Sequence, residues 1–278
     1  TCTPKFVRET NRLKRVVTQS LGYIIEEMKT SNFDIIGNEV EFKKGGKYEP
    51  IKLELDNGKR AEIIGKIDRI DLAKTADGNY VRIIDYKSSI RNLDYGEVYE
   101  GLQIQLLTYL DATCEIEDFK PAGILYFNLT DEKLNRKVIE EEIKEELRKQ
   151  FKMKGLILAD VNIIKMMDTD LESGYSKNVP ARIKAGGEEI IPTGSSVATN
   201  IEFEKLQKYT KKIIKEISND ILKGNIELKP YFKVNERRTA CEYCSYKSIC
   251  RFNKGYCEND YNYIYGLKKD EMINKISK

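Results

Sequence analysis

The spacing of apolar residues predicts three long helices separated by strand-type segments. Residues 5–29 repeat their apolar positions every three to four residues, and we expect this amphipathic stripe to pack in the core. Residues 95–113 have the same period. A third helix is predicted to begin at the capping box of Thr199 and Glu202 and to end before Gly224. The stripe of the first helix consists of Leu13, Val17, Leu21, Ile24 and Met28.

Alternating or β-rich apolar runs predict four strands. These runs cover residues 51–56, 60–72, 80–87 and 121–129. Asn57-Gly58 and Asp77-Gly78-Asn79 are turn sequences, so we expect the first three strands to be consecutive in a sheet. Residues 131–154 are expected to form a strongly charged helix. Residues 169–198 contain scattered glycine and serine, which favours an irregular insertion or mobile loop.

Charged residues stand out within two of these apolar strands. Asp68 lies in the second strand, and Asp85 and Lys87 end the third. Because side chains alternate across a strand, Asp85 and Lys87 point to one face and Tyr86 to the other. Two carboxylates can hold a divalent cation, and a lysine can meet the attacking water or the phosphate charge, as in a metal-dependent phosphodiesterase. The alternative is that these groups, together with Asp71, are solvated charges.

The helix predicted over 95–113 carries two polar residues that could serve the same site. Gln105 and Tyr109 are four residues apart, so their side chains lie one above the other on a helix. Together they could orient a water molecule and a phosphate. Gln103 points away from Gln105, and we rank it lower. The alternative is an amphipathic helix with one amide at its border.

Three cysteines lie close together in the last part of the sequence. Cys241, Cys244 and Cys250 form a C-x2-C-x5-C pattern, in which the first two thiolates can reach one metal and the third follows from the next turn. Cys257 could complete a zinc site. We expect no disulfide framework, because the chain is large and has the character of a cytosolic protein without a secretory signal. Three unconnected thiols are the alternative.

Basic and aromatic residues are interleaved around these cysteines. Cations meet phosphates and rings stack on bases, so this composition favours a path for single-stranded DNA, with a solvated basic face as the alternative. The residues that we expect to contact DNA are Arg237, Arg238, Lys247 and Arg251. The surrounding set also includes Lys229, Lys233, Lys254, Tyr231, Phe232, Tyr243, Tyr246 and Phe252.

Composition agrees with a globular protein. The chain has 278 residues, of which 40% are hydrophobic and 9% aromatic, enough for a substantial core in one domain with appendages. The net charge of +3 says little about nucleic acid. No apolar run approaches the roughly 20 residues that span a bilayer, so we expect a cytoplasmic protein without membrane association. The pattern G-x-x-x-x-G-K-[ST] is missing, and ATP binding by this chain is not expected.

Three motifs in this order resemble the PD-(D/E)xK nuclease superfamily, in its RecB-like branch. They are G-x-I-D-R-I-D at 65–71, D-Y-K at 85–87 and Q-x-x-x-Y at 105–109. The resemblance implies an α/β core of the restriction-endonuclease type, with a mixed, mostly antiparallel sheet flanked by helices. A cysteine-bearing segment would follow this core at its C-terminal end.

The resemblance also implies roles for individual residues. The catalytic set is Asp68, Asp85, Lys87, Gln105 and Tyr109. Asp68, Asp85 and the carbonyl of Tyr86 would bind Mg²⁺ or Mn²⁺, and Lys87 would be the catalytic lysine. RecB-like nucleases usually supply a metal-binding histidine from a helix before the core, whereas this chain contains no histidine.

The cysteine pattern resembles the iron–sulfur staple of a narrower group, the AddB-type chains of AddAB helicase–nucleases, and the sequence over 50–255 favours this group. In that group three C-terminal cysteines and one far upstream hold a 4Fe–4S cluster, which implies Cys241, Cys244 and Cys250 as ligands. Cys2 lies too close to Asp68 to be the upstream ligand. The chain starts without methionine, and we expect a fragment that is weakly active or inactive alone.

We therefore expect an exodeoxyribonuclease domain of a helicase–nuclease that processes double-strand breaks for homologous recombination. Its expected partners are single-stranded DNA ends and an AddA-type helicase–nuclease subunit in a heterodimer. The alternatives are a stand-alone iron–sulfur exonuclease of the CRISPR-adaptation type and a non-catalytic, zinc-containing nucleic-acid-binding module. The expected organisation is a helical segment over 1–48, a nuclease core over 49–168 and 199–230, an insertion over 169–198, and a cysteine-rich segment over 231–278.

Overall fold

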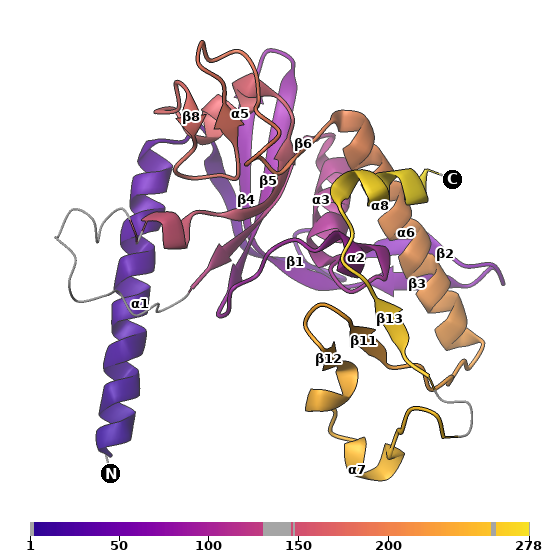
Figure 1. Cartoon of the computed structure of the whole chain (residues 1–278). Helices are drawn as coiled ribbons and strands as arrows, with labels where there is room; N and C mark the ends of the chain where they lie inside the picture. The colour runs from indigo at the N-terminus through magenta and orange to yellow at the C-terminus, as the bar shows by residue number, and fades with distance from the viewer. Residues whose placement is uncertain (1–2, 130–145, 147, 257–259, 278) are drawn as a thin grey trace. The chain divides into compact units, whose positions relative to one another are not determined.

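The computed structural model describes residues 3–129, 146, 148–256 and 260–277, which fold into two compact units (Figure 1). Each unit is built from segments that are separated in the sequence. The first unit comprises Thr1–Ile51, Ile63–Leu93 and Gln105–Glu204, and the second comprises Lys52–Glu62, Asp94–Ile104 and Lys205–Lys278. Cys2, Cys257 and most of the charged helix predicted over 131–154 lie outside the described residues.

A six-stranded mixed sheet forms the centre of the first unit. The strand order is β1-β4-β5-β6-β7-β10, with antiparallel pairing of β1 with β4, β4 with β5 and β6 with β7, and parallel pairing of β5 with β6 and β7 with β10. The bounds are β1 (Asp34–Phe42), β4 (Gly65–Thr75), β5 (Gly78–Lys87), β6 (Lys120–Asn128), β7 (Lys154–Leu158) and β10 (Val197–Ala198). The predicted α/β arrangement around a mixed, mostly antiparallel sheet is confirmed.

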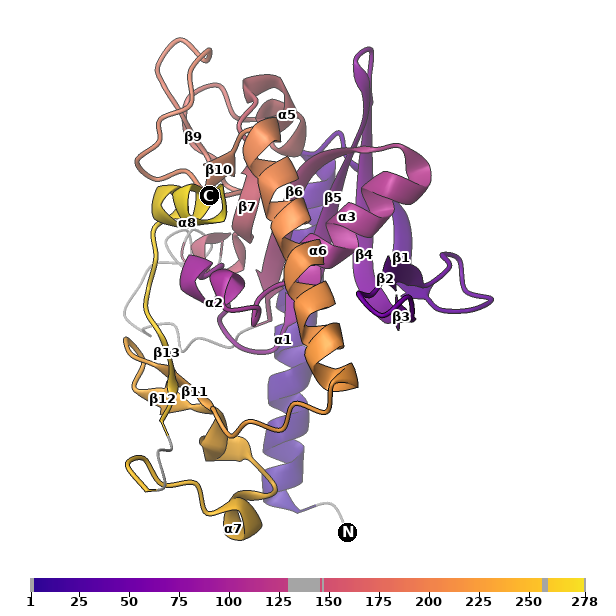
Figure 2. The same ribbon diagram turned by 90° about the vertical axis from the view of Figure 1, so that its right-hand side faces the viewer.

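Two helices cover opposite faces of this sheet, as both views show (Figures 1 and 2). These are α1 (Pro4–Lys29) and α3 (Gln105–Glu117), of which α3 packs on β5 and β6. The side chain of Thr3 caps α1 by accepting a hydrogen bond from the N–H of Phe6, and Pro4 occupies the first turn, where a missing N–H is tolerated. The short helix α5 (Val161–Met167) follows β7.

The apolar stripe of α1 does not pack in the core, contrary to our expectation. Leu13 is 64% exposed and Val17 is 53% exposed. The N-terminal half of the helix extends past the sheet (Figure 1), so nothing described in this unit covers it. Further along α1, the buried residues include Ser20 and Glu27. Glu27 forms ion pairs with two arginines of the sheet.

The single helix predicted over 95–113 is two helices in the structure. α2 (Tyr95–Tyr99) ends at a turn in which Gly101 has a φ of 78°, and α3 begins only at Gln105. This left-handed conformation suits glycine, because it has no Cβ. The side chain of Asp94 caps α2 by accepting hydrogen bonds from the N–H groups of Gly96 and Glu97.

Residues 169–198 are mostly irregular but contribute to the core. They contain the short pair β8 (Gly174–Tyr175) and β9 (Arg182–Ile183), and they end in β10 at the edge of the sheet. Val179 and Ala181 are fully buried.

The second unit contains one long helix, a hairpin and a small three-stranded sheet. Thr199 and Glu202 form the predicted capping box at the start of α6 (Asn200–Leu222), most of which lies in this unit. The hairpin of β2 (Ile51–Glu54) and β3 (Arg60–Ile63) turns at Gly58, whose φ is 74°. This hairpin is a sheet of its own, so the strand predicted over 60–72 is split into β3 and β4, and the expectation of three consecutive strands in one sheet is wrong. The small sheet has the order β12-β11-β13, from β11 (Tyr231–Lys233), β12 (Arg238–Thr239) and β13 (Asn262–Ile264). Short helices follow as η1 (Ala240–Tyr243), α7 (Lys247–Cys250) and α8 (Lys269–Ile276).

No helix of the described residues combines the length and the apolar character needed to cross a membrane.

Candidate active site and cysteine-lined cavity

Asp68 and Asp85 lie opposite each other at the end of the β4–β5 ladder. This antiparallel ladder ends at the paired residues Arg69 and Ile84, so the next residue along each strand brings the two aspartates together. Residues that are directly opposite in an antiparallel pair share a face. The Oδ2 atom of Asp68 accepts a hydrogen bond of 2.9 Å from the N–H of Tyr86, which fixes this carboxylate across the two strands.

Asp85 is a buried carboxylate in contact with Lys87. Its side chain is only 6% exposed, and its Oδ2 lies 2.6 Å from the Nζ of Lys87. Burial raises the pKa of Asp85 and the charge of Asp68 raises it further, whereas the ammonium of Lys87 opposes this shift. No donor among the described residues makes a well-aligned hydrogen bond to this Oδ2. The contact of this oxygen with Lys87 is therefore an ion pair without an aligned hydrogen bond.

These two carboxylates suit a divalent cation by charge, ligand type and position. Mg²⁺ prefers oxygen ligands, and one or two carboxylates commonly share it with waters and substrate phosphates. Within the described ranges, no three His, Cys, Asp or Glu side chains gather closely enough to hold a metal. Asp68 and Asp85 would thus supply part of the coordination, and the role of the Tyr86 carbonyl stays a prediction.

Gln105 and Tyr109 meet on α3 as their spacing predicts. The Nε2 of Gln105 donates to the hydroxyl of Tyr109 over 3.2 Å, and the N–H of Lys66 donates to the same hydroxyl over 3.3 Å. Tyr109 also stacks on Phe42, and a Cβ on Gly65 would lie 2.8 Å from its hydroxyl. Tyr109 therefore fixes the start of β4, three residues before Asp68, while Gln105 is exposed.

The other face of the same two strands carries a buried charge network that the sequence did not reveal. Arg69 donates to Asp71 through Nε at 2.7 Å and Nη2 at 2.8 Å, and Arg82 donates to Asp71 through Nε at 2.9 Å. Glu27 of α1 accepts from both arginines, at 3.2 and 2.5 Å. Asp71 is fully buried and is therefore not a solvated charge.

This network is almost fully paired. Burial lowers the pKa of Arg69, but the charge and hydrogen bonds of Asp71 outweigh it, and the net pKa is raised. The guanidinium of Arg82 lies 4.8 Å from the ring of Phe33, and its Nη1 lacks a hydrogen-bond partner among the described residues. Two carboxylates and two guanidiniums cancel, so this face has no charge left for a ligand.

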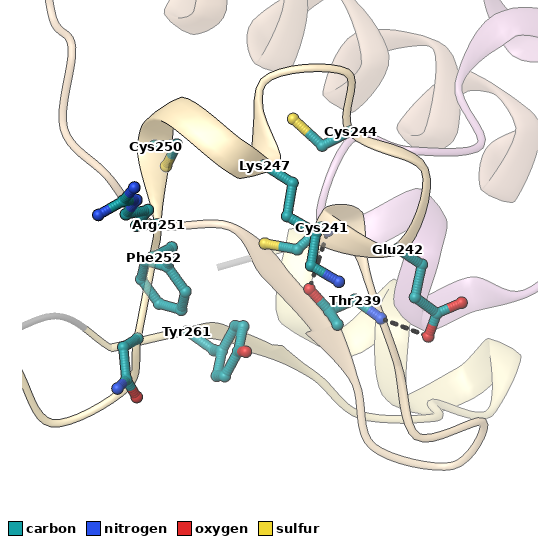
Figure 3. A pocket seen from close by; sticks show the side chains of 10 residues that line it. Thr239, Cys241, Glu242, Cys244, Lys247, Cys250, Arg251, Phe252 and Tyr261 are labelled. Atoms are coloured by element: carbon teal, nitrogen blue, oxygen red, sulfur yellow. Dashed lines mark hydrogen bonds between the residues drawn. The ribbon is translucent and has the colours of Figure 1, made fainter.

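The three predicted cysteine ligands line one cavity of the second unit. The cavity has a volume of ≈ 410 Å³, and Figure 3 shows Cys241, Cys244 and Cys250 around it, with Phe252 and Tyr261 on the same pocket. Cys241 lies in η1, Cys244 follows that helix, and Cys250 ends α7. These thiols are free in the structure. The cavity thus offers the ligand type that a cluster or zinc requires, although its three sulfurs do not converge on one point among the described residues.

Cys114 differs from the cavity cysteines in its location and in the pKa of its thiol. It lies on α3 of the first unit, and burial raises the pKa of its thiol to about 12. Such a thiol is protonated at neutral pH and unreactive.

The structure divides the basic and aromatic residues around the cavity into exposed and packed groups. Lys247 and Arg251 line the cavity, and Arg237 and Arg238 lie exposed at the β11–β12 turn. In contrast, the Nζ of Lys233 contacts Glu97 of the same unit at 2.5 Å and is largely buried. The aromatic residues divide in the same way. Tyr243 and Tyr246 are 85% and 70% exposed, whereas Phe252 packs on Tyr261 with ring centroids 4.9 Å apart.

Gln103 is buried in the second unit, and both the nitrogen and the oxygen of its amide are hydrogen-bonded. Its Nε2 donates to Glu97, and its Oε1 accepts from the N–H of Asp94, each over 3.2 Å. Glu97 therefore connects Gln103 with Lys233, and this buried cluster holds α2 and β11 together. The neighbour Gln105 is exposed instead.

A mixed sheet with paired aspartates and a lysine at the end of adjacent strands defines a nuclease-type α/β core. The family model of the PD-(D/E)XK nuclease superfamily matches residues 7–251, and this chain belongs to that superfamily. The RecB-like resemblance inferred from the motifs is thereby confirmed.

The chain is also similar to the AddB-type chains of ATP-dependent helicase/deoxyribonucleases. It is 41% identical to the Acetivibrio thermocellus protein over 276 residues, which cover 96% of this chain and 24% of the relative. For the Clostridium novyi protein the identity is 42% over 272 residues, with 95% and 23% covered. For the Thermoanaerobacter pseudethanolicus protein it is 39% over 282 residues, with 99% and 24% covered. The chain thus spans about a quarter of the length of these curated relatives.

Proposed function

We propose that this chain is a metal-dependent nuclease domain that hydrolyses DNA phosphodiester bonds. The observation that carries the proposal is the pair Asp68 and Asp85 on one face, with Lys87 Nζ at 2.6 Å from the buried Asp85. The opposite face of the same strands is neutralised by its own ion pairs, whereas on this face Asp68 has no ion-pair partner among the described residues.

The residues of this face would have different roles in the reaction. Asp68 and Asp85 would hold Mg²⁺ or Mn²⁺ through their oxygens. When bound, this ion supplies Lewis-acid stabilisation of the scissile phosphate and lowers the pKa of water. Lys87 presents a positive charge, which stabilises negative charge that develops on the phosphate. Tyr109 keeps the start of β4 in place, and Gln105 is bonded to Tyr109 beside it.

The cavity cysteines would hold a 4Fe–4S cluster. Cys241, Cys244 and Cys250 would supply three thiolates, and the free thiols around one cavity support this assignment. Such a cluster would hold η1 and α7 together. Anaerobic purification and metal analysis test it: iron with visible absorption is expected, and stoichiometric zinc without DNA cleavage would favour the zinc-containing binding module instead.

The proposed substrate is DNA with single-stranded ends. Arg237, Arg238, Lys247 and Arg251 would contact phosphates, and the exposed rings of Tyr243 and Tyr246 would stack on bases. The names of the relatives describe one chain of a multi-chain helicase/deoxyribonuclease, which supports a partner of the AddA helicase–nuclease type. Double-strand break processing for homologous recombination and a cytoplasmic location belong to the same proposal.

Cleavage of single-stranded DNA by the full-length protein tests the proposed function. Activity should require Mg²⁺ or Mn²⁺, and Asp85→Ala and Lys87→Ala should each abolish it while the protein stays folded. Lys74→Ala is the matched control, because Lys74 is an exposed lysine of the neighbouring strand β4. Wild-type cleavage by the Lys87→Ala protein would overturn the assignment.

A further inference from the structure

Asn128 is a buried polar residue beside Lys87 with no part in the chemistry described so far. It ends β6 in parallel register with Lys87 on β5, and it is 2% exposed. Its Oδ1 accepts from the N–H of Arg91 over 2.8 Å, and its Nδ2 donates to the carbonyl of Arg91 over 3.2 Å. One amide thus holds both backbone groups of Arg91.

The segment that Asn128 holds is exposed although it is fixed. Residues 88–91 follow Lys87 directly and have no helix or strand structure, and Ile90 is 53% exposed. The N–H of Leu129 donates to the carbonyl of Lys87 over 2.7 Å, which closes the other end of this turn. An exposed segment with two such anchors is preorganised, so that little ordering entropy is lost when a ligand binds.

Arg91 supplies a cation to this turn. Its side chain is exposed, and among the described residues no carboxylate forms an ion pair with it. Asn128 is in register with Lys87 and holds the backbone of Arg91, so the Arg91 side chain starts beside the end of β5 that carries Asp85 and Lys87.

We propose that residues 88–91 form a phosphate-binding turn, in which Arg91 contacts a phosphate of the DNA strand bound at the Asp68–Asp85 site and Asn128 is a positioning residue. A guanidinium binds phosphate through paired hydrogen bonds, and this geometry requires a fixed orientation. Asn128 provides that orientation because it holds the backbone and leaves the guanidinium free. This inference rests on the proposed function.

The salt dependence of DNA binding separates this role from a structural one. The full-length protein is titrated with single-stranded DNA at several salt concentrations, with Ca²⁺ in place of Mg²⁺ and intact DNA verified on a gel. Loss of one phosphate contact should make the slope of log K against log salt shallower by about 0.7. Arg91→Ala should show this change, and Arg91→Lys should restore most of the slope.

Variants of Asn128 test the positioning role without a change of charge. Asn128→Leu keeps a branched side chain of similar shape, and Asn128→Ala removes it. Both should flatten the salt slope in the direction of Arg91→Ala although the guanidinium is present. Thermal unfolding of each variant establishes that the protein is folded, and Lys74→Ala is the charge control on the neighbouring strand.

The outcomes distinguish this inference from the proposed function. An unchanged slope in Arg91→Ala, together with an inactive Lys87→Ala protein, would overturn the turn as a phosphate site and leave the nuclease assignment in place. A flattened slope in Arg91→Ala with an unchanged slope in both folded Asn128 variants would remove Asn128 from the proposal. Normal cleavage by Lys87→Ala would overturn the nuclease assignment itself.

Discussion

The strands β4 and β5 carry charged side chains on both faces, and the two faces differ in how those charges are compensated. On the face toward α1, Arg69 and Arg82 are paired with Asp71 and Glu27, and all four are nearly or fully buried. Positive and negative charges are equal in number there. Buried charges need such partners, because desolvation is costly.

The opposite face is less completely paired. Lys87 forms an ion pair with Asp85, whereas Asp68 has no ion-pair partner among the described residues. Charge density alone does not separate the two faces, since both have several ionised groups within a few residues. The charges on the face toward α1 are all paired, whereas those on the opposite face are not. We propose that the incompletely paired face takes the cation.

Asp71→Asn and Asp68→Asn form the most demanding test of this comparison. Asp71 accepts three hydrogen bonds from two buried arginines, so its neutralisation should cost about 3–5 kcal/mol of unfolding free energy. Asp68 is less buried and an amide oxygen can still accept from Tyr86, so Asp68→Asn should cost less than about 1 kcal/mol. Urea unfolding measures both. Equal losses in the two variants would remove the distinction between the faces.

Glu27→Gln tests whether α1 is attached through the same network. Glu27 accepts from both buried arginines, and replacing its charge should lower the unfolding free energy by about 3 kcal/mol. Glu26→Gln is the matched control one residue away, where an exposed carboxylate pairs with Lys29 and little change is expected. Thermal unfolding of the pair measures the difference. A loss in Glu26→Gln as large as that in Glu27→Gln would contradict the network.

Asp85→Asn should raise the free energy of unfolding, unlike the variants above, when no divalent cation is present. Burial raises the folded-state pKa of Asp85, so its ionised form disfavours folding at neutral pH. The neutral amide should therefore make the protein more stable than wild type at pH 7. This advantage should shrink as pH falls through the raised pKa, where the wild-type carboxyl takes up its proton. A variant that is less stable than wild type at pH 7, measured with EDTA, would show that Asp85 is fully compensated by Lys87.

Tyr109→Phe should lower the free energy of unfolding only modestly. The hydroxyl accepts from Lys66 and Gln105, and its loss should cost about 1 kcal/mol. Gln105→Ala should change stability less, because Gln105 is exposed. Unfolding midpoints and cleavage rates are measured together. A cleavage loss in Gln105→Ala without a change of midpoint would assign Gln105 to the chemistry, whereas loss of stability in that variant would make it structural.

The turns were predictable because their signals are local, whereas the strand predicted over 60–72 is two strands, β3 and β4, in different sheets. Gly58 and Gly78 have φ values of 74° and 135°, and the turn sequences around them indicated the hairpins directly. The capping box of Thr199 and Glu202 fixed the start of α6 in the same way. The alternation along β5 was also sufficient to place Asp85 and Lys87 on one face.

Features that depend on distant parts of the chain were not predictable in this way. The network joins Glu27 to Arg69 and Arg82, which are 42 and 55 residues away, and no local pattern indicates that pairing. The stripe of α1 has the period of a core helix, yet Leu13 and Val17 are exposed. The break at Gly101 was missed because apolar spacing continued across it.

Binding of Mn²⁺ to the purified protein is the most direct test of the central claim, which is that the face with incomplete pairing takes a divalent cation. Calorimetric titration should show Mn²⁺ binding to the wild-type protein. Asp68→Asn and Asp85→Asn should each weaken or abolish it, while Glu26→Gln should not. Unchanged Mn²⁺ affinity in both aspartate variants would contradict the account.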